Sequence, residues 1–225
     1  VETLIAACAA LNAAAARRPF DAPPRVGGPE ARAYALARAG LDALGEGDTS
    51  EAAAYLALHA ALAAHALGPE KDEDAQTYFA RALAIAPSKG EWWNDLGVLH
   101  KWRGRWQAAF DAFLRARARL GDRRGVLWNA ALAATALGDG DVAAGLWRDL
   151  GFTVRLSAGG MPIVDDVPPR QVRVPSKDAG YGFVRGPREG FEVVWVTPLS
   201  PGHGVVSSAS FRDCPVDYGD LVLFD

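Results

Sequence analysis

The sequence predicts an α+β protein with more than one domain, in which an α-solenoid of helix–turn–helix repeats precedes a small β-rich domain. Similar residues recur 34 positions apart, as in Phe79, Phe113 and Trp147. A fixed period of this size is typical of stacked copies of one supersecondary unit. Alanine-rich stretches with helical spacing continue to Leu150, after which valine, glycine, proline and serine take over. The second domain is therefore expected to begin near residue 152.

Two alanine- and leucine-rich helices are expected ahead of the repeats, over Thr3–Arg17 and Pro29–Leu44. Their apolar residues recur at helical spacing, which predicts one buried face on each helix. We expect residues 1–50 to form a helical cap or a degenerate repeat that covers the open end of the stack. The residues that offer N-caps for the following helix are Asp48, Thr49 and Ser50.

The repeats are predicted over residues 51–151, and their clearest copy runs from Gly90 to Arg123. The residues of this copy that follow the spacing W-x2-L-G-x2-Y, with His in the last place, are Trp93, Leu96, Gly97 and His100. They are followed by Ala109, Phe113 and Ala116 on the next predicted helix. Because Gly97 and Ala109 are small, the two helices can approach closely where they cross. Gly104 is expected to form the turn between them.

This copy resembles a tetratricopeptide repeat, a helix–turn–helix unit of about 34 residues. Weaker copies keep the same register upstream, over Leu56–Lys89, and downstream, over Arg124–Leu150. The downstream copy departs from the family pattern because its first helix lacks the signature Trp and Tyr. The resemblance covers somewhat under half of the chain and implies three repeats.

The resemblance also implies a concave groove, lined by the first helix of each repeat, that binds a segment of a partner protein. The family's groove positions that we select as partner contacts are Asn94, Val98, Lys101, Trp102, Trp128, Leu132 and Thr135. Only Asn94 and Lys101 are of the type that the family's carboxylate clamp requires, so that clamp is not expected. Trp102 and Trp128 are instead candidate anchors for an apolar or helical peptide. The alternative is that they pack against the N-terminal helices or the β segment.

Residues 152–225 are predicted to form a small β-barrel or sandwich. The expected strands are Phe152–Ser157, Gln171–Pro175, Phe191–Thr197, Gly204–Ser208 and Leu221–Asp225. Val172 and Val174, like Val193 and Trp195, are expected to alternate with polar neighbours, as in half-buried strands.

One segment of this domain, Gly180–Val184, resembles the aromatic RNA-binding strand of cold-shock domains. In that family the equivalents of Tyr181 and Phe183 stack on bases. The alternative is a hairpin loop without a binding role. Nucleic-acid binding through the β domain is therefore kept as an alternative function, although the net charge of −3 argues against a protein that coats nucleic acids.

No catalytic motif, metal site or cofactor site is recognised, and we do not expect an enzyme. His59 and His65 are six residues apart and do not share a helix face. His100 falls at a repeat position and is expected to pack. An enzyme with a site between the domains, around His203 and Cys214, is kept as a further alternative.

A basic cluster is expected at the end of the middle repeat, either as a solvated helix face or as a surface for an acidic partner. Its members are Arg115, Arg117, Arg119, Arg123 and Arg124.

No apolar run is long enough to span a bilayer. Cys8 and Cys214 are expected to be free thiols in a reducing compartment, which favours a cytoplasmic protein. The excess of Arg over Lys is typical of a GC-rich bacterial coding sequence. Because the chain starts at Val1 rather than Met, we expect native residues upstream, and the last strand suggests continuation past Asp225. The function predicted from the sequence is that of a scaffold or adaptor that binds a partner protein. The sequence does not give the identity of the partner, the pathway or the oligomeric state of the chain.

Overall fold

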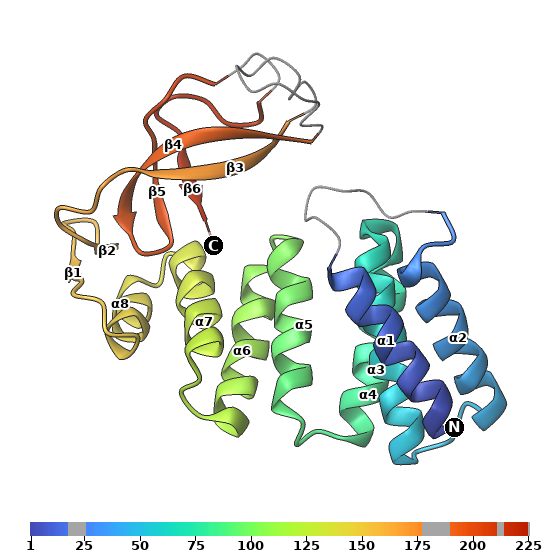
Figure 1. The fold of residues 1–225 in the computed structure, drawn as a ribbon. Helices are drawn as coiled ribbons and strands as arrows, with labels where there is room; N and C mark the ends of the chain where they lie inside the picture. The colour runs from blue at the N-terminus through green and yellow to red at the C-terminus, as the bar shows by residue number, and fades with distance from the viewer. Residues whose placement is uncertain (18–25, 177–189, 211–213, 225) are drawn as a thin grey trace. The chain divides into compact units, whose positions relative to one another are not determined.

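The computed structural model describes residues 1–17, 26–176, 190–210 and 214–224. The chain divides into two compact units, Val1–Gly121 and Asp122–Asp225. The described residues contain eight α-helices followed by short antiparallel strands (Figure 1), which confirms the α+β class. Within the described part of the chain, no helix is long and apolar enough to cross a membrane.

Unit 1 consists of helices. Their bounds are α1 Glu2–Ala16, α2 Pro29–Leu44, α3 Glu51–Leu67, α4 Asp72–Ile85, α5 Gly90–Trp102 and α6 Trp106–Leu120, with a 3₁₀ turn over Pro69–Lys71. The predicted helix Pro29–Leu44 has the bounds of α2. Ser50 caps α3, because its side chain accepts a hydrogen bond from the backbone N–H of Ala53 at 3.2 Å. Of the three candidate N-caps, Ser50 therefore fills the position.

Helices α1 and α2 both pack against α3. Gly40 of α2 lies at this contact, where an added Cβ would come within 3.0 Å of the side chains of Leu4 and Leu56. Cys8 is fully buried in the same core. The predicted role of residues 1–50 as the cap of a repeat stack stays a prediction, but the face of α3 that these helices cover is an apolar one.

Residues 34 positions apart have the same burial in α4 and α6. Ala75 and Phe79 of α4, like Ala109 and Phe113 of α6, have no exposed surface. Gly97 of α5 faces Phe113, and a Cβ at this glycine would come within 3.0 Å of three atoms of the phenyl ring. The predicted close approach of α5 and α6 is therefore confirmed. The turn between them has Gly104 at φ +65°, as predicted.

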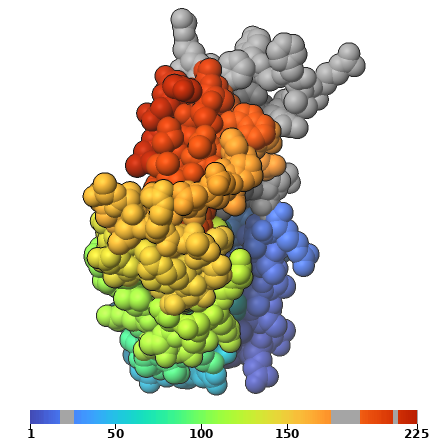
Figure 2. Space-filling view, turned by 90° about the vertical axis from the view of Figure 1, so that its left-hand side faces the viewer, coloured from blue at the N-terminus to red at the C-terminus, as the bar shows by residue number. Residues whose placement is uncertain are grey.

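Unit 2 combines two helices with all the described strands. Their bounds are α7 Arg124–Leu137, α8 Gly140–Asp149, β1 Arg155–Leu156, β2 Pro162–Ile163, β3 Arg170–Ser176, β4 Gly190–Ser200, β5 His203–Val206 and β6 Leu221–Leu223. Strands β1 and β2 form a small hairpin, and the other four form an antiparallel sheet in the order β3-β4-β5-β6. In Figure 2, the surface of α8 and the β1–β2 hairpin (yellow to gold) continues into that of the sheet (orange to red).

The expected strands agree with these only in part. Each predicted segment overlaps a strand, but β1 is much shorter than Phe152–Ser157, and β2 is not predicted at all. The described strands form two antiparallel sheets, and closure into a barrel or sandwich stays a prediction. The division after Gly121 also groups α7 and α8 with the β segment, whereas the sequence places a boundary after residue 151. The physical reason is that α8 packs on β1 and β2.

The sheet has one buried and one exposed face. Val194 and Val196 of β4 are fully buried, and Val206 of β5 joins them in the core. The intervening residues Val193 and Trp195 are 38% and 46% exposed. The alternation predicted for β3 is confirmed by Val174, which is 8% exposed, but the prediction for β4 is wrong, because Val194 and Val196 face the core and Val193 and Trp195 face away from it. Because residues 193–196 of β4 are all apolar, their sequence does not distinguish the two faces.

Candidate partner-binding surface

The predicted contacts on α5 lie on one face of this helix. Asn94, Val98 and Trp102 are four residues apart and therefore follow one another along the helix. Asn94 and Val98 are partly buried, whereas the indole of Trp102 is 45% exposed. Lys101 is only 8% exposed, and its ammonium nitrogen lies 5.6 Å from the centroid of the Trp102 ring. Trp102 is therefore the most exposed apolar group on this face of α5.

The predicted contacts on α7 have different surroundings. Leu132 and Thr135 are 3% and 4% exposed. The Thr135 hydroxyl accepts a hydrogen bond from the indole N–H of the fully buried Trp147 at 3.1 Å. Trp128 contacts the edge of Trp147, with ring centroids 5.0 Å apart, and lies 6.0 Å from Phe152. These side chains form part of the core of unit 2.

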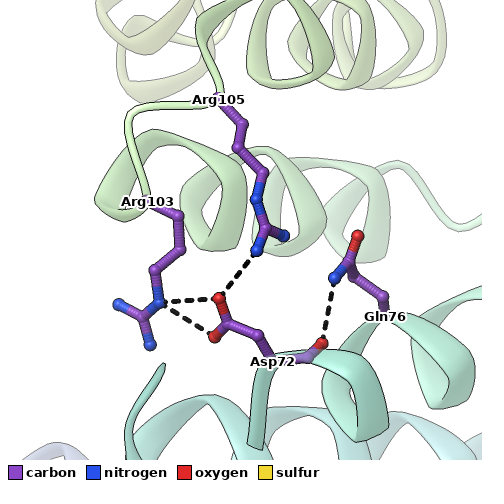
Figure 3. A network of polar contacts seen from close by, with 4 residues as sticks. All are labelled: Asp72, Gln76, Arg103 and Arg105. Carbon is purple, nitrogen blue, oxygen red and sulfur yellow. Dashed lines mark hydrogen bonds and ion pairs between the residues drawn. The ribbon is translucent and has the colours of Figure 1, made fainter. Parts of the chain in front are cut away.

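The end of α5 is fixed by an ion-pair network centred on a buried carboxylate (Figure 3). Asp72, at the first position of α4, is 7% exposed and accepts hydrogen bonds from two arginines of the α5–α6 turn. Arg103 Nε lies 2.8 and 3.0 Å from the two carboxylate oxygens, and Arg105 Nη2 lies 3.0 Å from one of them. The backbone carbonyl of Asp72 accepts from the Gln76 side chain at 3.1 Å. Because Arg103 directly follows Trp102, this network holds the residue next to the exposed indole.

Neither Asp72 nor its pairing with Arg103 and Arg105 is predicted from the sequence. Asp72 and Arg103 are 31 residues apart, and nothing in either local sequence marks the pair. A usable signal is an acidic residue at the start of one repeat helix together with an arginine in the next inter-helix turn.

Two histidines lie close to this network. Burial, followed by the nearby Arg103 charge, lowers the pKa of His65 to about 4. Burial also lowers the pKa of His100, with Arg105 contributing. Both imidazoles are therefore neutral at pH 7. The described residues contain no group of three or more His, Cys, Asp or Glu side chains that could hold a metal ion.

Asp95 of α5 is a partly buried carboxylate close to another acidic residue. Burial raises its pKa to about 6, and the carboxylate of Glu91, one helical turn earlier, adds to the increase. At neutral pH this group is largely ionised, and its burial opposes folding. Asp95 is not among the site residues predicted from the sequence, because its burial depends on tertiary packing.

The basic cluster predicted at the end of α6 is partly used for packing. The guanidinium carbons of Arg115 and Arg119 lie 4.7 and 5.4 Å from the centroid of the Trp93 ring. Arg119 also donates hydrogen bonds to the carbonyl oxygens of Pro87 and Arg115. These two arginines thus connect α6 to the start of α5, in addition to any role at the surface.

The residues behind the alternative functions lie in unit 2. Tyr181 and Phe183 fall outside the described residues. His203 is 5% exposed, and its Nδ1 lies 2.5 Å from the hydroxyl oxygen of Ser200. Burial lowers the pKa of His203, and it raises the pKa of the Cys214 thiol. Trp195 stands on the exposed face of the sheet opposite Gln171 of β3.

Comparison of the sequence with known protein families and with curated proteins gave no match. The candidate surface is therefore defined by the geometry of this chain alone.

Proposed function

We propose that this chain is a scaffold or adaptor of the tetratricopeptide-repeat type, which binds a segment of a partner protein along α5. Trp102 is the anchor of the interaction, and Asn94 and Val98 continue the contact toward the start of the helix. The three residues are spaced to follow an extended or helical segment along one helix face.

The exposure of Trp102 is the observation that carries this proposal. A large aromatic side chain that remains 45% exposed is the residue type that dominates binding energy at protein interfaces. The helix end that carries Trp102 is fixed by Asp72 through Arg103, so little conformational freedom is lost on binding. The recurrence of buried residues at 34-residue intervals in α4 and α6 supports the repeat class.

The test is affinity capture from a lysate with the wild type, Trp102→Ala and Trp195→Ala. The two tryptophans are 45% and 46% exposed and lie in different units, so Trp195→Ala is a matched control. The proposal expects a protein that is captured by the wild type and Trp195→Ala but lost with Trp102→Ala. Capture that survives Trp102→Ala would refute the assignment of this surface.

A second candidate function is the binding of single-stranded nucleic acid by unit 2. It is favoured by one observation, the exposed Trp195 on a central strand, because a flat aromatic ring is a stacking platform for bases. Arg173 of β3 pairs with Val193, next to this ring. In the same experiment this function predicts that capture is lost with Trp195→Ala and after nuclease treatment.

A further inference from the structure

The turn between β4 and β5 packs against the helices of unit 2. Its central residues, Pro201 and Gly202, are buried, which is unusual for a hairpin turn. A Cβ at Gly202 would lie 2.8 Å from Leu132 Cδ1 and 3.1 Å from the nearest ring atom of Trp147. The turn therefore lies directly on α7 and α8, and a side chain at position 202 would require Leu132 to move.

Two further contacts hold the turn in this conformation. The hydroxyl of Ser200 is hydrogen-bonded to His203 Nδ1 and also accepts from the backbone N–H of Gly202 at 3.3 Å. The backbone N–H of Phe224 donates to the carbonyl oxygen of Gly202 at 2.9 Å. The turn is thus tied both to its own strands and to the chain after β6.

Leu132 is one of the residues that the repeat pattern assigns to partner contact. In this structure its side chain is already covered, at 3% exposure, and Gly202 lies against it. A partner segment therefore has no access to Leu132 while the turn is in place.

We infer that the β4–β5 turn is an internal ligand of α7 and α8, which covers the Leu132 position that the repeat pattern assigns to partner contact. This inference rests on the proposed function, because only that function makes Leu132 a partner-contact position. The occlusion itself is a property of unit 2 and is measured without a partner.

The test is thiol labelling of a Leu132→Cys variant with a maleimide, read at each cysteine by mass spectrometry. With the native turn, labelling at position 132 is expected to be slow. Adding Gly202→Val, whose side chain collides with the helices, is expected to accelerate it at least about tenfold by opening the turn locally. Gly159→Ala is the matched control, since the nearest atom to its Cβ is 3.8 Å away, and it leaves the rate unchanged.

Folding is monitored in the same samples. Cys8 is fully buried in unit 1 and reports unfolding there, and the near-ultraviolet circular dichroism of the whole chain, to which Trp128 and Trp147 contribute, reports loss of tertiary packing. If Gly202→Val unfolds unit 2, Ser200→Ala replaces it, because this change removes the hydrogen bond to His203 without a collision. Fast labelling with the native turn, or no acceleration in a folded turn variant, would overturn the inference. Failure to capture a partner through Trp102 would instead count against the proposed function.

Discussion

The close approach of α5 and α6 at Gly97 gives a quantitative prediction for Gly97→Ala. The new Cβ would come within 3.0 Å of three ring atoms of Phe113, which has no exposed surface and cannot swing into solvent. Overpacking of this kind costs about 1–3 kcal/mol. Replacing a helical glycine by alanine contributes about 1 kcal/mol in the opposite direction. We therefore expect Gly97→Ala to destabilise unit 1 by up to about 2 kcal/mol.

Urea unfolding followed by circular dichroism measures this change. Gly145→Ala in α8 is the control, since no atom lies within 4 Å of its Cβ, and this variant is expected to be more stable than the wild type by about 0.5–1 kcal/mol. In a Phe113→Leu background the cost of Gly97→Ala should decrease by about 1 kcal/mol or more. If Gly97→Ala stabilises unit 1 as Gly145→Ala stabilises unit 2, the proposed packing of α5 on α6 is wrong.

Two further predictions concern buried carboxylates. The pKa of Asp95 rises from 3.8 to about 6 on folding, so the wild type loses about 3 kcal/mol of stability as the pH rises through this window. Asp95→Asn should remove most of this pH dependence in unfolding measured from pH 4 to 8, and an unchanged profile would contradict the assignment. Asp72→Asn should cost about 2–4 kcal/mol, because Arg103 and Asp72 are largely buried. The exposed pair Arg155–Asp165 is the control, and Asp165→Asn should unfold at nearly the wild-type denaturant concentration. Equal losses for the two substitutions would contradict the importance of the Asp72 network.

The helical part of the fold was largely predictable because its signals are local. The bounds of α2, the cap at Ser50 and the turn at Gly104 each follow from a few adjacent residues. The 34-residue period also located the core residues of α4 and α6, since each copy buries the same positions. In the β segment, glycine and proline marked the turns, but strand β2 has only two residues and no pattern to recognise.

The candidate site was less predictable because its decisive contacts are long-range. The repeat register predicted partner contact for both Trp102 and Leu132. In the structure Trp102 is exposed, whereas Leu132 is covered by Gly202. The pairing of Asp72 with Arg103 likewise joins separate helices. A single sequence shows the spacing of apolar residues within each helix or strand. It does not show which distant segment packs on which face of that element.

The most direct test of the central claim is calorimetric titration of a captured partner segment into the wild type, Trp102→Ala and Trp195→Ala. For an anchoring aromatic residue, we expect Trp102→Ala to weaken binding by about 30-fold or more. Trp195→Ala, which removes an equally exposed indole from unit 2, should bind as the wild type does. Unchanged affinity in Trp102→Ala, or a loss confined to Trp195→Ala, would contradict the claim that α5 binds the partner.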